Sequence, residues 1–200
     1  MATRDGACHF TLTAAPPGLP AAIGWHRPPS VPSAACGREA ERPFPRTPPL
    51  WHSFAMAEIV ALYLKPARRA PMQPVPELRL VAGRGIEGNA NQGGKRQVTV
   101  LAEEAWRAAT RGAGASNLDP ALRRANVLIR GLDLAETVGR LLELGPCRLL
   151  VRGETTPCHR MEEVHPGLEA ALRPEWRGGV FGEVLEGGLI RVGDPVVWAG

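Results

Sequence analysis

Several features that would assign this chain to a common class are missing from its sequence. The four cysteines (Cys8, Cys36, Cys147 and Cys158) include no CxxC pair and no zinc-finger spacing, so neither a zinc site nor a disulfide framework is predicted. A reducing cytoplasm fits this cysteine usage best. No apolar run reaches the roughly eighteen residues that a membrane span needs, and the N-terminus lacks the layout of a secretory signal. The sequence therefore predicts a soluble, cytoplasmic protein with no membrane partner.

Clustered charge and the common catalytic motifs are also missing. The net charge is +4 and the pI is near 9.2, but the basic residues are scattered without a run of about five or six, so no nucleic-acid partner is expected. The sequence holds no Walker loop, no GxGxxG between a strand and a helix, and no HExxH. No Ser-His-Asp arrangement and no close carboxylate pair can be assembled from it.

Residues 1–55 differ in composition from the rest of the chain. They hold ten of the 20 prolines and show no helical or alternating period. Such a segment cannot bury enough surface to offset its chain entropy, so we predict a disordered extension with some polyproline II character. Trp25, Trp51 and Phe54 are then isolated apolar residues of a tail. Because Met56 opens an apolar segment, we expect the folded domain over residues 56–200, and we hypothesise that Met56 is the biological start.

The body is predicted to be mainly β with short helices, an α+β fold. Apolar residues make up 44% of the chain and aromatic residues only 5%, which predicts an aliphatic core. Glycine-interrupted alternation from residue 178 onwards is typical of a β-meander, and strands are also predicted over residues 59–64, 78–82, 97–101, 127–129 and 147–152. His165 is interpreted as a surface or capping residue, and helices are predicted over residues 102–111, 120–124, 133–142 and 161–172, the last of them interrupted at Pro166.

Cys158 is the strongest chemical candidate in the body. It follows a predicted strand, and Pro157 stiffens the backbone that approaches it. Because His159 and Arg160 make its surroundings electropositive, the thiolate is favoured over the thiol. The alternative is that Cys158 is a small buried hydrophobic residue, which is how we interpret Cys147. The local sequence leaves both interpretations of Cys158 open.

A glycine-rich loop and several basic residues form a second candidate feature. Five glycines between residues 83 and 94 precede a predicted strand, and such a loop can offer backbone N–H groups to an anion while Lys95 and Arg96 supply charge. It could equally be an ordinary mobile hairpin loop. Arg123, Arg124, Asn126 and Arg130 surround the strand predicted over residues 127–129. The three arginines form either a solvated rim or, if they meet Lys95 and Arg96 in space, an anion pocket.

Taken in order, six short motifs resemble those of the MOSC domain. This domain forms the C-terminal part of molybdenum cofactor sulfurases and also occurs as small stand-alone bacterial proteins. The resemblance runs from about residue 57 to residue 198 and depends on Gly85-Ile86-Glu87-Gly88, Arg96-Gln97-Val98, Arg124-x-Asn126, Gly131-x-Asp133-Leu134, Pro157-Cys158 and Gly193-Asp194.

The resemblance implies a MOSC-like β-barrel that binds the molybdenum-pterin cofactor, molybdopterin. Family members use the cysteine that matches Cys158 to ligate molybdenum or to carry sulfur as a persulfide. Some relatives reduce N-hydroxylated compounds, and others transfer sulfur. Pyridoxal phosphate belongs to sulfurases fused to a further domain, for which we expect no room in this chain. The resemblance places the cofactor and its anionic tail beside Gly88, Asn89, Lys95, Arg96, Arg124, Asn126 and Arg160.

The sequence departs from the family pattern in the glycine-rich loop. The family usually has Asp after the second glycine of the first motif, often with His two residues later, where this chain has Asn89 and Asn91. Asn keeps a carbonyl acceptor but cannot transfer protons.

The sequence leaves three hypotheses for the function. The first is a molybdenum-cofactor oxidoreductase with a small substrate and a redox partner. The second is a sulfur-carrier or cofactor-delivery module that serves an accepting enzyme, and the third is a domain that keeps the fold without the cofactor.

Overall fold

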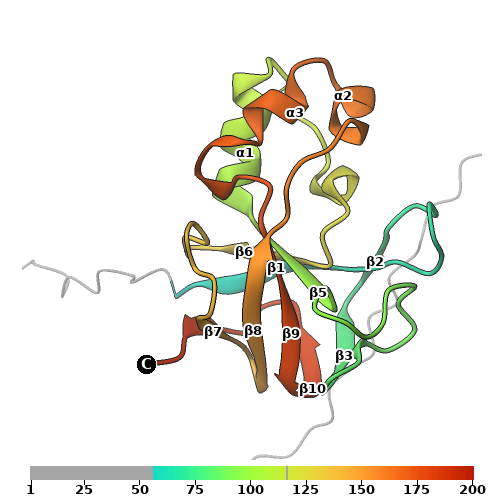
Figure 1. The fold of residues 1–200 in the computed structure, drawn as a ribbon, viewed down its shortest axis with the longest axis vertical. Coiled ribbons are helices and arrows are strands. Elements are labelled where there is room, and N and C mark those ends of the chain that lie inside the picture. Colours follow the sequence, from blue (N-terminus) through green and yellow to red (C-terminus); the bar gives the residue numbers. More distant parts are fainter. Residues whose placement is uncertain (1–55, 116) are drawn as a thin grey trace, which may run out of the picture. The chain divides into compact units, whose positions relative to one another are not determined.

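The computed structural model describes residues 56–200 except residue 116, so the predicted extension over residues 1–55 lies outside the described residues. In the described part, two sheets carry most of the chain and the helices gather beyond one end of the larger sheet (Figure 1). The prediction of a mainly β body with short helices is confirmed. None of the described helices is long and apolar enough to cross a membrane.

The larger sheet has eight strands in the order β11-β7-β8-β9-β5-β6-β1-β2. Neighbouring strands within this sheet are antiparallel, except that β5 and β6 are parallel. The bounds are β1 (Glu58–Leu64), β2 (Gln73–Val75), β5 (Val98–Ala102), β6 (Val127–Arg130), β7 (Leu141–Leu144), β8 (Cys147–Glu154), β9 (Val180–Glu186) and β11 (Val196–Trp198). A smaller sheet has the order β10-β3-β4 and consists of β10 (Gly188–Arg191), β3 (Glu77–Val81) and β4 (Gly85–Ile86).

The larger sheet curls until the segment before β11 meets β1. The Ile59 N–H donates to the carbonyl of Asp194 at 2.9 Å, the Val196 N–H donates to that of Ala57 at 2.7 Å, and a single bridge pairs Glu58 with Pro195. No ladder of described strands joins the two edges of the sheet. The predicted barrel is therefore a curved sheet that is not closed.

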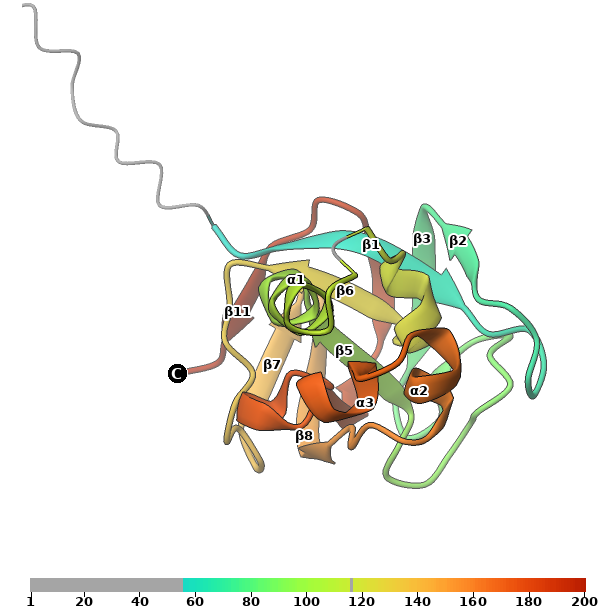
Figure 2. The ribbon, with the colours of Figure 1, turned by 90° about the horizontal axis from the view of Figure 1, so that it is seen from above.

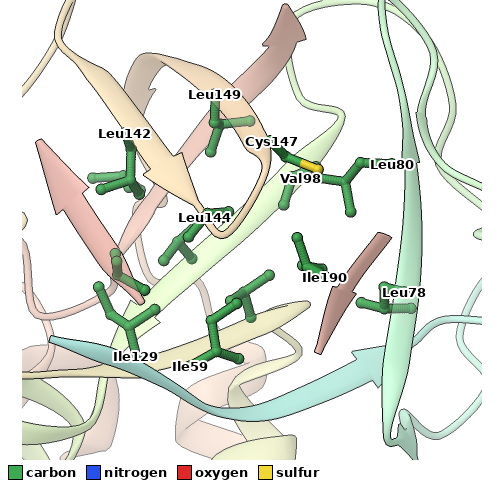
Figure 3. Close-up of a cluster of buried hydrophobic side chains, with 14 of the residues drawn as sticks. Ile59, Leu78, Leu80, Val98, Ile129, Leu142, Leu144, Cys147, Leu149 and Ile190 are labelled. Atoms are coloured by element: carbon green, nitrogen blue, oxygen red, sulfur yellow. The ribbon is translucent and has the colours of Figure 1, made fainter. Parts of the chain in front are cut away.

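Aliphatic side chains from both sheets fill one core, as the composition predicts. In Figure 3, Ile59, Ile129 and Leu149 of the larger sheet and Leu78, Leu80 and Ile190 of the smaller sheet surround a common interior, and each is at most 4% exposed. Cys147 is fully buried in this core, and burial, followed by the charge of Asp194, raises the pKa of its thiol to about 11. The interpretation of Cys147 as a core residue is confirmed.

The helices pack on the other side of β5 and β6 around a second apolar cluster (Figure 2). Trp106, 1% exposed, packs there with Leu101, Met161 and Leu168. Asp119 caps one short helix by accepting from the Ala121 N–H at 2.8 Å. The helical elements are α1 (Glu103–Gly112), η1 (Pro120–Arg123), α2 (Arg160–Val164), α3 (Leu168–Ala171) and η2 (Pro174–Trp176).

The predicted helix over residues 133–142 is wrong. The chain there makes turns, with positive φ at Glu136 (55°) and Gly139 (84°), and then enters β7. Leu142 and Leu144 alternate toward the core and pair with Leu149 and Cys147. Because pairing with β8 buries both leucines completely, it outweighs the local helix propensity.

The predicted β-meander after residue 178 is also wrong. Three strands are present, but β9 pairs with β5 and β8, β10 pairs with β3, and β11 pairs with β7. Alternation identifies a strand without identifying its partner. The glycine turns between these strands redirect each one toward a different neighbour.

Candidate functional site

A pocket of about 310 Å³ gathers most of the residues proposed from the sequence. It lies where β1, the glycine-rich loop, β5, the end of η1 and the start of α2 meet. None of the described residues that line it is Asp, Glu or His. The lining consists of Lys65, Asn89, Asn91, Arg96, Gln97, Thr99, Arg123, Arg124, Asn126, Cys158, Arg160 and Met161; we call it the thiol pocket.

Most, but not all, of the predicted site residues line this pocket. The exposed Lys95 and Gly88 lie outside the pocket. The predicted residues that line it are Asn89, Arg96, Arg124, Asn126, Cys158 and Arg160. Arg130 is also elsewhere. It forms an ion pair with Glu103 on α1 at 2.7 Å, so for Arg130 the interpretation as a rim residue is right.

Cys158 is exposed, so its interpretation as a buried hydrophobic residue is wrong. The backbone on both sides of it is fixed. Before it, the Thr155 N–H donates to the carbonyl of Gly179 at 2.7 Å, and Pro157 is buried. After it, the Cys158 carbonyl accepts from the Met161 N–H at 2.8 Å as α2 begins. The thiol is therefore accessible on a rigid support, an arrangement suited to reactive or ligating groups.

Arg123 forms a buried wall of the thiol pocket. Its side chain is only 7% exposed, and one terminal nitrogen donates to the Thr155 carbonyl. Its Nε is buried with no hydrogen-bond partner among the described residues. Burial and then the charge of Arg96 lower the pKa of Arg123 to about 10, while a thiolate at Cys158 and the carboxylate of Glu154 oppose that shift. A buried guanidinium with an unused donor is a strong candidate to bind an anion.

The other cations of the pocket repel one another. Burial, followed by the charges of Arg124, Arg96 and Arg160, lowers the pKa of Lys65 below its ordinary value. Burial and then Arg160 lower the pKa of Arg124. Arg124 donates from Nη1 to the Ala70 carbonyl at 2.7 Å, but its Nη2 is buried without a partner among the described residues. An anion in the pocket would relieve this repulsion.

Arg96 stands at the exposed mouth of the pocket and is held by an aromatic ring. Its guanidinium carbon lies 5.5 Å from the centroid of the Phe181 ring on β9. Burial lowers the pKa of Arg96, and a thiolate at Cys158 works in the opposite direction. The guanidinium and the thiol are therefore close enough for their charges to interact.

Asn126 lines the pocket, but its amide is already fully bonded. Oδ1 accepts from the Thr99 hydroxyl at 2.9 Å, and Nδ2 donates to the Tyr63 carbonyl at 3.1 Å and to Asn89 Oδ1 at 3.4 Å. These contacts join β1, β5 and β6 at the floor of the site. The sequence predicts a ligand-binding residue here, and in the structure the hydrogen bonds of its side chain go to other residues of the chain.

Asn89 anchors the glycine-rich loop to the end of β1. Its Oδ1 accepts from the Lys65 N–H at 2.9 Å, and the Lys65 carbonyl accepts from the Ala90 N–H at 2.7 Å. Its Nδ2 donates to the carbonyl of Asn91 at 3.3 Å. Because the bond from Lys65 needs only an oxygen acceptor, Asn in place of the family's usual Asp keeps the loop in position.

Two residues missed in the sequence, Lys65 and Gln97, complete the site. Gln97 is buried and donates to the carbonyls of Gly83 and Gly94 at 3.0 and 2.8 Å, which fixes the glycine-rich loop at two points. Its place in the Arg96-Gln97-Val98 motif was the available signal. Lys65 belongs to no motif and reaches the pocket only because the loop docks against the end of β1.

Sulfate binding should weaken as the pH rises above neutrality. Sulfate stays a dianion in this range, whereas Lys65 loses its charge at a lower pH than an ordinary lysine because its pKa is lowered. We expect several-fold weaker binding to the full chain near pH 9.5 than near pH 7.5 in a calorimetric titration. Lys65→Gln should reduce this slope, and Lys95→Gln, at an exposed position outside the pocket, should keep it. If the affinity of Lys65→Gln for sulfate fell with pH as steeply as that of the wild type, Lys65 would not be part of the anion site.

Comparisons with known proteins identify a family and a fold. A family model described as the MOSC domain matches residues 87–197. The crystal structure of the YuaD protein from Bacillus subtilis matches with a TM-score of 0.60 and 20% identity, covering 70% of this chain and 94% of that chain. YiiM from Geobacillus stearothermophilus matches with a TM-score of 0.57 and 18% identity, covering 72% of this chain and 75% of that chain. At these identities the solved structures support the fold alone.

A second YiiM structure, from Escherichia coli, gives a similar result, with a TM-score of 0.56, 17% identity and coverage of 72% of this chain and 70% of that chain. No curated protein matches the chain.

Proposed function

The chain belongs to the MOSC domain family of molybdenum-cofactor-related domains, and from this premise we propose that it is an oxidoreductase that binds the molybdenum cofactor through Cys158. Its substrates would be N-hydroxylated or similar small compounds. The observation that carries the proposal is the thiol pocket, where an accessible thiol lies beside Lys65 and four arginines. None of the described residues that line this pocket carries a carboxylate. A phosphate-bearing cofactor fits that charge, and a thiolate is a suitable ligand for a soft metal.

The residues of the pocket fit this cofactor in charge and in donor type. The buried Nε of Arg123 and Nη2 of Arg124 are unused donors that an anionic tail would occupy. The described residues contain no group of three or more His, Cys, Asp or Glu that could hold a metal alone. Cys158 would therefore supply one thiolate, and the remaining metal ligands would come from the cofactor.

When bound, the cofactor supplies two-electron oxo-transfer chemistry, and the chain supplies binding, orientation and electrostatics. Arg123 and Arg124 would hold the anionic tail, while Gln97 and Asn89 keep the loop wall in place. Because no described lining residue is Asp, Glu or His, the protons of a reduction would come from water, which reaches the exposed Cys158. The electrons would come from a redox partner.

The exposure of Cys158 favours a second candidate function, sulfur carriage. The Cys158 thiolate would attack the outer sulfur of a persulfide donor, so that a new S–S bond forms at Cys158 while the donor's S–S bond breaks. The electron pair leaves with the donor as its thiolate, and the nearby Arg96 would stabilise the persulfide anion. Mass spectrometry after incubation with the donor should then find about 32 mass units, one sulfur atom, added at Cys158. Repeated absence of that adduct would remove this candidate.

Molybdenum content tests the main proposal directly. The full chain would be produced in a host that makes the cofactor, beside Cys158→Ala and the control Thr156→Ala, an exposed position in the same loop that does not line the pocket. We expect close to one molybdenum per chain in the wild type and the control, and several-fold less in Cys158→Ala, because the thiolate ligand is lost.

The alternative results of this experiment are equally informative. Equal metal in all three proteins would keep the pocket as a cofactor site but reassign Cys158 to sulfur carriage. No metal in any folded protein would overturn the proposal.

A further inference from the structure

Arg96 is held at the thiol pocket in a different way from most of the other cations there. Lys65, Arg123 and Arg124 each donate a side-chain hydrogen bond to an oxygen of the chain. Within the described part of the chain the Arg96 guanidinium forms no such bond, and its carbon lies 5.5 Å from the centroid of the Phe181 ring. The face of an aromatic ring attracts a cation. The ring therefore restrains the guanidinium and leaves its N–H donors free for a ligand.

Phe181 belongs to β9, which lies between β8 and β5 in the larger sheet (Figure 1). It pairs with Thr99 on β5 and with Gly153 on β8. Because directly paired residues project from the same face of a sheet, the ring lies on the face from which Thr99 lines the thiol pocket. Arg96 precedes β5, and Cys158 follows β8. The strand that carries the ring thus separates the strands that lead to the guanidinium and to the thiol.

Gly153 makes room for this ring. Its φ is not positive, so its backbone conformation does not require glycine. A Cβ at this position would lie 2.9 Å from Phe181 Cζ and 3.0 Å from Cε1, too close for the ring to stay where it is. Glycine inside a strand weakens the strand and often marks a close approach. The alternative is purely structural, because an aromatic ring over a strand glycine also stabilises a sheet.

We propose that Phe181, packed over Gly153, is a positioning residue that directs the Arg96 guanidinium toward an anion bound beside Cys158. A long arginine side chain loses rotamer freedom when it binds a ligand, and the ring restricts that freedom beforehand. Preorganisation of this kind raises affinity without adding a contact to the ligand. This inference rests on the proposed function, because the anion that Arg96 contacts is the one bound in the thiol pocket.

A double-mutant cycle on the full chain tests the inference, with inorganic phosphate as the probe in a calorimetric titration. We expect Phe181→Leu to weaken phosphate binding about threefold, because Arg96 loses the aromatic face. In the Arg96→Met background the same substitution should change the affinity by less than about 1.5-fold, because no guanidinium is left to position. Gly153→Ala keeps the ring but displaces it, and it should behave like Phe181→Leu in both backgrounds.

A second cation–π pair supplies the matched control. The Arg140 guanidinium carbon lies 4.3 Å from the centroid of the Trp198 ring, and neither residue lines the thiol pocket. Trp198→Leu should therefore leave the affinity for phosphate unchanged.

Two results would overturn the inference while the anion site stands. One is wild-type affinity in Phe181→Leu. The other is an equal loss of affinity with and without Arg96, which would mean that the ring supports the sheet and not the guanidinium. If Phe181→Leu does not fold, Gly153→Ala in the two backgrounds decides the same question. If phosphate does not bind to the wild-type protein, the anion site itself is refuted, and this inference falls with it.

Discussion

Replacing Arg123 by methionine should weaken phosphate binding to the full chain by about a hundredfold. The guanidinium is buried beside Arg96 and Cys158, and its Nε has no described partner. A charge-assisted hydrogen bond from such a desolvated donor is strong, because no water competes for it. A titration monitored by calorimetry, at constant ionic strength, would measure the loss.

Two further variants separate binding from structure at this position. Arg123→Lys keeps a charge but loses the planar set of donors, so we expect an intermediate loss of affinity. Arg107→Met removes a 61% exposed arginine on α1 and serves as the control for net charge. Wild-type affinity in Arg123→Met would mean that the guanidinium only supports the Thr155 carbonyl.

The stability of Arg123→Met should change little. Methionine relieves the cost of burying a cation beside Arg96, but it leaves the Thr155 carbonyl without this donor, which costs about 1 kcal/mol. The two effects oppose each other. A large loss of affinity with a small change in the free energy of unfolding would therefore identify a binding residue.

Arg123 also shows where sequence analysis reaches its limit. The sequence places it beside a strand, as part of either a rim or a pocket. Its burial depends on Gly178, because a Cβ there would lie 2.9 Å from Arg123 Nη2 and would overlap the Thr155 carbonyl oxygen. A contact between residues so far apart along the chain leaves no local pattern. Lys65 was missed for the same reason.

Features with signals close together in the chain were predicted well. The strand predicted over residues 97–101 and the short helix predicted over residues 120–124 are both confirmed, as β5 and η1. The segment 133–142 was predicted wrongly because the burial of its leucines against β8 is a tertiary effect. The strand partners of β9, β10 and β11 likewise depend on contacts that alternation does not encode.

Replacing Asn126 by alanine should lower the free energy of unfolding by about 3 kcal/mol. The side chain is 5% exposed, and its removal takes interior hydrogen bonds from the Thr99 N–H and the Tyr63 carbonyl, while Asn89 Oδ1 keeps only its bond from the Lys65 N–H. Urea unfolding of the full chain would measure this as a lower midpoint with an unchanged slope. Asn117→Ala, at an exposed position, is the control and should change stability by less than about 0.5 kcal/mol.

The same variant decides whether Asn126 is a ligand or a scaffold. If its amide only joins β1, β5 and β6, the folded Asn126→Ala protein should lose far less phosphate affinity than Arg123→Met does. The opposite pattern, normal stability with binding abolished, would restore the ligand function that the Arg124-x-Asn126 motif predicts. Because all the amide's bonds go to other residues of the chain, we expect the loss to fall on stability.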